Sequence, residues 1–417
     1  MPNINLASQM EKYIMPEALH IIHIAVHLAQ KYGQPIYLVG GVVRDLLLNH
    51  QALDIDLVLE GNALDMARQL ASTTDSAVTL HTEFHTAKLQ LPSFTLDLAS
   101  ARSEYYQRPG DLPAVFPADI STDLRRRDFS INAMAISLNA ENYGQLLDEC
   151  GGLSDLQKHL IRVLHKQSFR DDATRMWRAI RYEQRLNFRI ERTTEVLLKQ
   201  NLSMLNSISR ERLWYELECI FGETQPENVL LRATELGLLY YIHPQIACSI
   251  LLDRWYEHAR QMSLPQKPGI GLYLALFLYD LEAAACEEII ESLKLSKNLS
   301  HILRDSVQIK TSLAALENSI LSPSFIYRSL CNYDTTAIKA NLIASESDNA
   351  RRHIQLYLKQ LCDVKPILNG NDLLALGIKP GPSISTILNR LLNARLDGEI
   401  SSHEDEILWI EQHRWLP

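Results

Sequence analysis

Strand-like segments are confined to the first third of the chain, and this distribution constrains the fold most. Four short runs, rich in β-branched residues or alternating in polarity, are separated by Gly, Asn, Pro or Ser; they are 36–39, 54–59, 87–91 and 94–98. Helical periodicity lies between them at 17–31, 42–49 and 62–72, and it dominates from residue 171 onward. We therefore expect an α+β fold, in which a domain with a small mixed sheet and helices is followed by an all-α remainder.

Composition narrows the class of protein. The 417 residues include 46% hydrophobic and 22% charged residues, which is typical of a folded globular chain of two to four domains. Because the net charge is −9, any nucleic-acid contact must come from a local cluster of basic residues. The six cysteines form no CxxC pair, the start of the chain has no signal-like pattern, and the apolar stretch Gly269–Leu281 is too short to cross a bilayer. We expect a cytoplasmic protein with no membrane partner.

The segment Leu38–Leu48 reads LVGGVVRDLLL, an apolar strand that runs through Gly40 and Gly41 into an amphipathic helix containing Arg44. Glycines lack a Cβ, so backbone N–H groups can approach a phosphate closely, and the N-terminus of a helix adds partial positive charge. Arg44 would add a charge-assisted contact. A plain tight turn uses the same two glycines, so the pattern alone leaves both interpretations open.

Three carboxylates follow on strand-like segments. Asp54 and Asp56 are two positions apart, which places them on one face of a strand, and Asp97 lies in the next alternating run. Adjacent carboxylates repel one another unless a cation is present, and Mg²⁺ favours such oxygen ligands together with water and phosphate. A DxD pair alone is usually a solvated strand face. The diglycine turn, the DxD strand and the later carboxylate together are typical of a nucleotidyltransferase palm, so we predict that these three residues are catalytic.

A basic cluster begins at Arg125–Arg127 and continues through Asp128 and Phe129 to Asn132. Consecutive arginines usually form a solvated charge run. Arginine also binds triphosphate or stacks on a base, and Asp with Asn can bond ribose hydroxyls. This segment therefore supplies the local positive patch that the net charge conceals.

A second basic segment, 171–181, reads DDATRMWRAIR. As one helix it would place Asp172 and Arg175 on one face, with a stripe formed by Arg175, Arg178 and Arg181. A salt-bridged surface helix would explain the pattern. Alternatively, Asp172 and Arg175 read a base edge, because cytosine and adenine both offer an amino donor beside a ring acceptor, whereas uracil and guanine present the opposite pattern.

Two proline-containing segments carry further expectations. The segment Tyr105–Thr122 contains Pro109, Gly110, Pro113 and Pro117 and is predicted to be a loop beside the sheet. Near the end of the chain, the turn KPGP at 379–382 either binds phosphates through a helix N-terminus or only caps that helix.

Six segments resemble, in order and spacing, the motifs of class II tRNA nucleotidyltransferases and bacterial poly(A) polymerases. They are GGVVRD (40–45), DID (54–56), RRDFSINAMA (126–135), DECGGLSDL (148–156), DDATRMWRAIRY (171–182) and SRERLWYEL (209–217). The strong resemblance covers about residues 36–220, and a weaker one continues to 369–388 and 396–400. One departure is Asp171, where many members of the family have Glu, which puts the supporting role of that position in doubt.

The resemblance implies a seahorse-like protein with a nucleotidyltransferase head, or palm, at 1–150, a helical neck with a nucleotide-selecting helix at 151–225, a body at 226–320 and a tRNA-binding tail at 321–417. It implies addition of CCA to the 3′ end of tRNA from CTP and ATP without a nucleic-acid template. The tRNA 3′-hydroxyl would attack the α-phosphate, with one metal activating the hydroxyl and a second receiving the pyrophosphate.

The resemblance also implies residue roles. Asp54 and Asp56 would hold Mg²⁺, and Asp97 occupies a position that is acidic in the family. The nucleotide would be bound by Gly40, Gly41, Arg44, Arg126, Arg127, Asp128, Asn132, Asp172, Arg175, Arg178 and Arg181. Asp172 and Arg175 would act as the protein template.

Several alternatives stay open. The chain could add only CC or only A, or it could be a poly(A) polymerase, which the acidic balance and the lack of a basic C-terminal extension disfavour. An idle RNA-binding protein should lack one of the key residues, and all are present. A metal phosphohydrolase is disfavoured because no His-Asp dipeptide occurs and His81 and His85 have no ligand spacing. The oligomeric state is left open.

Overall fold

A computed structural model describes residues 4–52, 54–107, 110 and 113–413. The chain divides into two compact units, Met1–Tyr241 and Ile242–Pro417. The finer division expected at 150, 225 and 320 stays a prediction. Pro109, which belongs to the predicted loop, lies outside the described residues.

A seven-stranded mixed sheet forms the centre of the first unit, with strand order β3-β4-β5-β2-β1-β8-β9. Its strands are β1 (Ile36–Val39), β2 (Ile55–Leu59), β3 (Ala77–His81), β4 (Thr86–Gln90), β5 (Thr95–Ser100), β8 (Ala135–Ser137) and β9 (Leu146–Leu147). The strands β2 and β5 are parallel and the other neighbours are antiparallel. The expected mixed sheet is confirmed, and the four predicted strand segments agree with β1, β2, β4 and β5 to within two residues.

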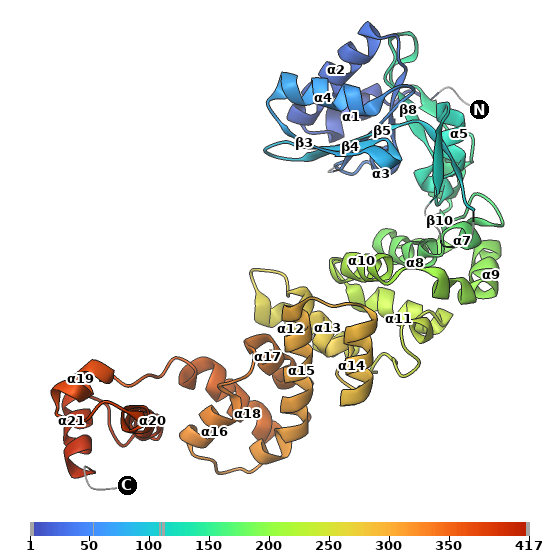
Figure 1. Cartoon of the computed structure of the whole chain (residues 1–417). Coiled ribbons are helices and arrows are strands. Elements are labelled where there is room, and N and C mark those ends of the chain that lie inside the picture. Colours follow the sequence, from blue (N-terminus) through green and yellow to red (C-terminus); the bar gives the residue numbers. More distant parts are fainter. Residues whose placement is uncertain (1–3, 53, 108–109, 111–112, 414–417) are drawn as a thin grey trace. The chain divides into compact units, whose positions relative to one another are not determined.

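The two faces of this sheet are covered differently. The helices of the sheet domain are α1 (Ala7–Tyr13), α2 (Pro16–Lys31), α3 (Gly41–Leu47), α4 (Ala63–Thr74) and α5 (Ile120–Arg125). Helices α2 and α4 lie over one face (Figure 1), where Ile55 and Leu57 join the large apolar core. On the other face, a smaller cluster joins Val58 to Leu124 of α5. Because side chains alternate along a strand, Asp56 lies on the side of the smaller cluster.

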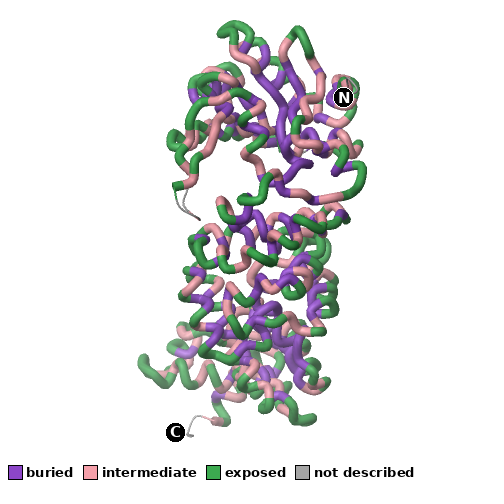
Figure 2. Tube along the Cα trace, turned by 90° about the vertical axis from the view of Figure 1, so that its right-hand side faces the viewer, coloured by how far each residue is buried: buried purple, intermediate pink, exposed green. Residues whose placement is uncertain are grey.

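Burial follows this arrangement. Figure 2 shows the central strands buried along most of their length, and every residue of β1 is buried. In β2, Asp56 is the one residue that is only partly buried. A polar side chain therefore emerges from the middle of an otherwise apolar strand.

The predicted loop at 105–122 is wrong in part. The strands β6 (Arg102–Tyr105) and β7 (Ala114–Pro117) form an antiparallel hairpin, and α5 begins at Ile120. Pro117 pairs with Arg102 at the open end of this two-stranded sheet. Proline lacks an N–H group, but at the end of an edge strand that loss disrupts little pairing, so the prolines did not prevent strand formation.

A helical region completes the first unit. It contains α6 (Gly152–Gln157), α7 (Ser168–Asp171), α8 (Thr174–Leu186), α9 (Arg192–Gln200), α10 (Arg210–Phe221) and α11 (Pro226–Leu236), with the short parallel pair β10 (Leu160–Ile161) and β11 (Arg189–Ile190). Trp177 of α8 is buried. Glu183 of α8 accepts hydrogen bonds from the Ile190 backbone N–H at 2.9 Å and from Arg232 Nε at 2.8 Å. These bonds attach α8 to β11 and α11.

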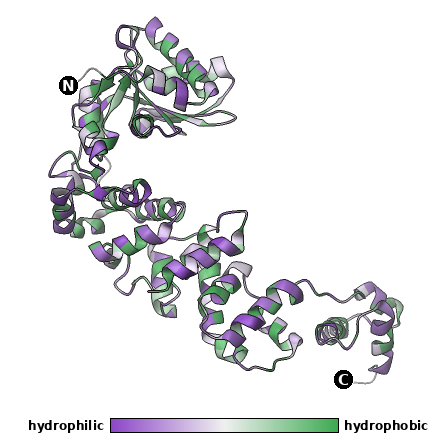
Figure 3. Cartoon of the chain, turned by 180° about the vertical axis from the view of Figure 1, so that it is seen from behind, coloured by the Kyte–Doolittle hydropathy of each residue, from purple (hydrophilic) through white to green (hydrophobic). Residues whose placement is uncertain are grey.

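The described part of the second unit is helical, as expected. Its helices are α12 (Leu252–Ser263), α13 (Ile270–Phe277), α14 (Ala283–Ser292), α15 (Lys297–Ser312), α16 (Pro323–Leu330), α17 (Thr335–Ala344), α18 (Asp348–Leu356), α19 (Gly370–Ala375), α20 (Pro382–Leu396) and α21 (His403–Gln412). Figure 3 shows hydrophobic and hydrophilic residues alternating along them. Helix α13 lies within the apolar stretch Gly269–Leu281, and most of its residues are buried.

Two further observations concern the helices. Gly381 directly precedes α20, so the KPGP turn caps that helix, while its contact with phosphate stays a prediction. Across the described ranges, no helix combines the length and the apolar character that a bilayer crossing requires.

Asp155 of α6 offers a test of how the fold supports the segment at 126–132. Its carboxylate accepts from Ser130 Oγ at 2.6 Å and from Arg162 Nε at 2.9 Å and is almost fully buried. We expect Asp155→Ala to lower the free energy of unfolding by about 2 kcal/mol, because it leaves the Ser130 hydroxyl unpaired in the interior. Denaturant unfolding of the whole chain measures this.

The matched control is Asp65→Ala, which removes an exposed hydrogen bond from the Asn62 side chain and a surface ion pair with Arg68; both side chains of the ion pair are more than half exposed. Such pairs contribute about 0–1 kcal/mol, so this variant should unfold like the parent. Equal losses for both variants would contradict the supporting role of Asp155.

Candidate active site

The three predicted catalytic carboxylates gather at one edge of the sheet. Asp56 of β2 and Asp97 of β5 are register partners on neighbouring parallel strands. Asp54 lies one residue before β2 begins, not within the strand as expected, and is exposed. The chain turns into the strand only at Ile55, which is the first of its residues buried in the core. Asp54 and Asp56 nevertheless line the same cavity.

The carboxylates at this edge repel one another. Burial, reinforced by the negative charges of Asp97 and Asp54, raises the pKa of Asp56 to about 6. The positive charge of Arg127 opposes this shift but does not cancel it. Lys88 lies 3.4 Å from Asp97, so part of that carboxylate's charge is already compensated. An additional cation near Asp56 would relieve the remaining repulsion.

These residues fit a magnesium ion. Within the described ranges, no group of three or more His, Cys, Asp and Glu side chains has the geometry of a metal site. A cation held by Asp54 and Asp56 would therefore take its other ligands from water and substrate. Mg²⁺ has this preference, since it keeps several waters and is usually bound by one or two carboxylates plus phosphates.

The diglycine turn lies directly beside the carboxylates. Gly40 has φ 75° and ψ −130°, a conformation that L side chains rarely adopt, and a Cβ built there would lie 3.0 Å from Arg127 Nη1. Helix α3 begins at Gly41. The turn thus requires glycine for its backbone, and it also brings the first backbone groups of α3 to the cavity wall.

A cavity of about 500 Å³ opens between the sheet edge and helix α8. Of the predicted site residues it is lined by Gly40, Gly41, Asp56, Arg126, Arg127, Asp128, Asn132, Asp172, Arg175 and Arg178. The same cavity is also lined by Phe84, Arg102, Glu104, Tyr106, Pro113 and Tyr182, none of which was predicted. We call it the first cavity. Its walls mix guanidinium and carboxylate groups, so it suits a ligand that carries phosphates and hydrogen-bonding edges.

Some predicted residues lie outside the first cavity. Arg44 is buried behind it and donates through Nη1 to Asn132 Oδ1 at 2.8 Å, with its Nε on Asp45. Arg181 lies within ion-pair distance of Glu216 and Glu223. For these two arginines, the observed contacts are with the protein itself, and their contact with a nucleotide stays a prediction.

Asp128 joins the sheet domain to helix α8. Its Oδ2 accepts from Arg178 Nε at 2.9 Å and from Nη2 at 2.7 Å, while its Oδ1 accepts from the Asn132 side chain. Although burial by itself raises the pKa of Asp128, the charge and hydrogen bonds of Arg178 outweigh it and hold the pKa below its ordinary value. Asp128 is therefore ionised and its partner is fixed in place.

The arginine pair of the basic cluster is held by Asp123, whose side chain is fully buried. Arg126 donates to Asp123 Oδ1 through Nη2 at 2.6 Å, and Arg127 donates to Oδ2 through Nη2 at 3.0 Å. Burial raises the pKa of Asp123, but the charges of Arg127 and Arg126 outweigh this and keep it below its ordinary value. The two guanidinium groups are thereby oriented before any ligand binds.

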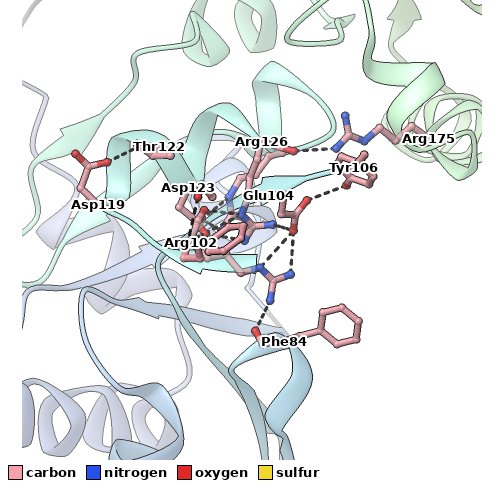
Figure 4. Close-up of polar contacts among 12 residues, drawn as sticks. Phe84, Arg102, Glu104, Tyr106, Asp119, Thr122, Asp123, Arg126 and Arg175 are labelled. Atoms are coloured by element: carbon pink, nitrogen blue, oxygen red, sulfur yellow. Dashed lines mark hydrogen bonds and ion pairs between the residues drawn. The ribbon is translucent and has the colours of Figure 1, made fainter. Parts of the chain in front are cut away.

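The hairpin β6–β7 supplies a second anchor (Figure 4). Glu104 accepts from Arg126 Nη1 at 2.6 Å, from Arg102 Nη2 at 3.0 Å and from the Tyr106 hydroxyl at 2.8 Å. Burial, together with the charge of Glu104, raises the pKa of Tyr106. The network spans the first cavity, because Arg175 of α8 donates to the Arg126 backbone oxygen at 2.8 Å.

The structure corrects the placement of the template pair. Asp172 does not lie on the helix with Arg175; it has extended backbone angles between α7 and α8. Its Oδ1 accepts from the Thr174 N–H and hydroxyl and from Arg212 Nη2 at 2.8 Å. Helix α8 cannot begin earlier because Asp172 serves as its N-terminal acceptor. Asp172 and Arg175 still line the same cavity.

Comparisons with known proteins agree with this geometry. Residues 36–162 match the poly A polymerase head domain, and residues 187–249 match the probable RNA and SrmB-binding site of polymerase A. An A-adding tRNA nucleotidyltransferase of Halalkalibacterium halodurans is 30% identical over 97% of this chain and 94% of its own length.

The chain belongs to the tRNA nucleotidyltransferase family. An A-adding tRNA nucleotidyltransferase of Geobacter sulfurreducens is 37% identical over 89% of this chain, although the match covers only 44% of that relative. The chain therefore spans less than half the length of this relative. The solved structure of the Thermotoga maritima CCA-adding enzyme complexed with tRNA is similar over 99% of this chain and 100% of its own, with a TM-score of 0.80 and 30% identity.

In this member of the tRNA nucleotidyltransferase family, several residues of the cavity and of the bonds that support it escaped the sequence analysis. Asp123 of α5 had a signal, because Arg126 and Arg127 follow it by three and four positions, just after that helix ends. Arg212 lies within the SRERLWYEL segment, but nothing in that segment identified its partner. Glu104 and Phe84 come from the hairpin and from a turn between β3 and β4, and no local pattern marks them.

The raised pKa of Asp56 gives a prediction for the protein without divalent cations. Between the ordinary value of 3.8 and the folded value of about 6, the folded state binds more protons than the unfolded state. Stability should therefore fall as pH rises through this range and stay lower above it. We expect Asp56→Asn, which lacks the charge, to unfold at a higher temperature than the parent at pH 8. The gain should vanish near pH 4, as thermal unfolding scans would show.

A magnesium titration supplies the control for this experiment. Adding Mg²⁺ at pH 8 should stabilise the parent and leave Asp56→Asn almost unchanged, so the difference between them narrows. If Asp56→Asn raises the unfolding temperature equally at every pH, the carboxylate repulsion is not the cause of the stabilisation.

Proposed function

We propose that this protein adds the CCA end to tRNA, taking CTP and ATP as substrates and releasing pyrophosphate. The observation that carries the proposal is the first cavity, in which Asp56 of the sheet edge, the arginine pair Arg126 and Arg127, and the pair Asp172 and Arg175 line one space. These are the groups required to hold a triphosphate, a metal and a base edge at once.

Selection of the base is assigned to Asp172 and Arg175. Within the described part of the chain, the hydrogen bonds of Asp172 use Oδ1, so Oδ2 can accept from the amino group of cytosine or adenine. Arg175 donates through Nη1 to Ser168 Oγ and through Nη2 to the Arg126 backbone oxygen. A guanidinium has five N–H groups, so further donors remain for a ring acceptor of the base.

Catalysis rests on orientation and charge. Arg126 and Arg127, held by Asp123, would bind the triphosphate, and Arg178, held by Asp128, completes the positive wall. Mg²⁺ at Asp54 and Asp56 would supply charge stabilisation at the α-phosphate and lower the pKa of the attacking hydroxyl. Because the side chains are already fixed by internal bonds, little reorganisation is needed when the substrate binds.

We assign tRNA as the nucleic-acid partner, with the helical second unit contributing to its binding. The solved relative from Thermotoga maritima is a complex with tRNA and aligns with nearly the whole chain. No disulfide joins the cysteines in the described part of the chain, which suits a reducing compartment, and we place the protein in the cytoplasm.

Addition of A alone is the second candidate. It is favoured by the relatives from Geobacter sulfurreducens and Halalkalibacterium halodurans, both of which are A-adding tRNA nucleotidyltransferases. The template pair does not separate the two candidates, because one carboxylate and one guanidinium serve both C and A.

The test incubates the purified protein and Mg²⁺ with tRNA transcripts that end before CCA, after C and after CC. Each transcript receives CTP, ATP or both, and the products are sequenced. Complete CCA on the shortest transcript supports the proposal, and A on the CC transcript alone supports the second candidate. Addition of CC only would identify a CC-adding enzyme and a long A tail a poly(A) polymerase, and either result would refute both candidates. No incorporation would refute the enzyme assignment.

Variants connect the activity to the site. Asp54→Asn and Asp56→Asn should each lower kcat/KM by at least about 100-fold, since charge stabilisation of a transition state is worth that much. Arg175→Ala should reduce discrimination against UTP and GTP by about tenfold or more, because a bidentate base contact is lost. Asp75→Asn is the matched control: Asp75 is exposed at the end of α4 in a left-handed conformation that Asn adopts easily, so this variant should retain full activity.

A further inference from the structure

A second cavity of about 620 Å³ is lined by both Asp54 and Asp56. It meets the first cavity at three shared residues, Gly41, Asp56 and Tyr182. Asp54 lines only the second cavity, whereas Arg126 and Arg127 line only the first. The two spaces therefore adjoin at Asp56, one of the residues that would hold the metal, and they differ in charge.

The chemistry of nucleotidyl transfer assigns different contents to the two cavities. The attacking hydroxyl and the leaving pyrophosphate lie in line on opposite sides of the α-phosphate. The arginine-rich first cavity is suited to the triphosphate, and hence to the leaving group. The hydroxyl must then approach from outside the first cavity, and the second cavity is the adjoining space, since it contains Asp54 and shares Asp56.

The far wall of the second cavity carries an aromatic pair. The rings of His159 and Phe188 lie 4.9 Å apart between centroids and are tilted by 55°. Phe188 is buried, whereas His159 is exposed. The Arg189 backbone N–H donates to the His159 backbone oxygen at 2.9 Å, which joins the segments that carry the two rings. An exposed ring that is supported from behind is a suitable surface for stacking a base.

The rest of the cavity has the mixed character that a nucleotide requires. Leu48 and Leu186 supply apolar surface, and His50 and Gln51 supply polar groups. Arg185 also lines the cavity, with its guanidinium bound to Glu223. The arginine surplus of the first cavity is absent among the described residues that line this one, so a triphosphate is a poor occupant and a single nucleotide residue of an RNA chain is a better one.

We propose that the second cavity holds the 3′-terminal nucleotide of the RNA that is being extended, with its base stacked on the ring of His159. This inference rests on the proposed nucleotidyl transfer, because that reaction defines where the hydroxyl must be. His159 is thus a positioning residue: it places the terminal ribose beside Asp54 and Asp56 without contacting the reacting atoms itself.

The test is a binding measurement that needs no catalysis. Two RNAs are compared, a tRNA transcript that lacks CCA and the same transcript whose 3′-terminal residue has no base. For the parent protein, loss of the base should raise the Kd by about tenfold, the effect expected for one stacked base. In His159→Asn, which removes the ring, loss of the base should change the Kd little, because the two changes remove the same contact.

Two variants control this comparison. His159 has φ 55°, and Asn is one of the few residues that tolerate this conformation, so His159→Asn should unfold at the same temperature as the parent. His159→Phe keeps a ring and should restore the dependence on the terminal base, although it should unfold at a lower temperature because Phe is strained at this backbone angle. His81→Asn changes an exposed histidine at the end of β3, outside both cavities, and should behave like the parent.

The outcomes separate this inference from the proposed function. The inference is overturned if loss of the base raises the Kd by the same factor in His159→Asn as in the parent. It is also overturned if loss of the base leaves the Kd of the parent unchanged. Either result counts even when the protein adds nucleotides normally. If the dependence on the base disappears in His159→Asn and returns in His159→Phe, the inference stands. The inference would stand even if the incorporation assay detects no nucleotide addition, and that result would refute only the proposed reaction.

Discussion

The ion pair between Asp128 and Arg178 is the contact on which the site depends. Its partners are 50 positions apart in the chain, one beside the sheet and the other on α8, and they meet through two hydrogen bonds. Removing Arg178 would leave the buried carboxylate of Asp128 without its ion-pair partner, which is among the more costly changes in a protein interior. The bond from Arg175 to the Arg126 backbone oxygen reinforces the same connection. The first cavity exists because these bonds hold two walls that local structure does not join.

The positive and negative groups around the Asp128–Arg178 ion pair lie at different ends of the site and do not neutralise one another. The arginines of the first cavity are fixed by Asp123, Glu104 and Asp128, so the guanidinium groups cannot collapse onto Asp56. Asp56 in turn stays beside Asp54 and Asp97, at the cost of a raised pKa. One end of the site therefore favours an anion and the other a cation. A nucleoside triphosphate with Mg²⁺ satisfies both, which is why the proposed chemistry explains an arrangement that is unfavourable in the free protein.

The position of Tyr182 extends this argument to the second cavity. Tyr182 lines both cavities, and its ring lies within 6 Å of the guanidinium carbons of four arginines, at 5.3, 5.5, 5.6 and 5.9 Å. Cation–π attraction of this kind stabilises guanidinium groups that would otherwise repel one another. The proposed stacking surface at His159 lines the second cavity with Tyr182, so the RNA end and the nucleotide would occupy adjoining spaces around one set of carboxylates.

Much of the fold and of the site could be predicted from local patterns, because each of these features has a short-range cause. Alternation of polarity predicted the strands that carry Asp56 and Asp97, and the strained backbone at Gly40 follows from a diglycine between strand and helix. The motif order correctly indicated the family. What failed was equally local: prolines suggested a loop where the hairpin β6–β7 forms, and helical spacing placed Asp172 on a helix that begins after it. The sequence by itself thus determined the kinds of chemical group and the elements that carry them. Only the tertiary structure decided which distant groups meet. Asp128 and Asp172 find Arg178 and Arg212 through the packing of α8 and α10, and Glu104 finds Arg126 through the packing of the hairpin against the end of α5. Local sequence patterns do not specify these contacts between distant segments.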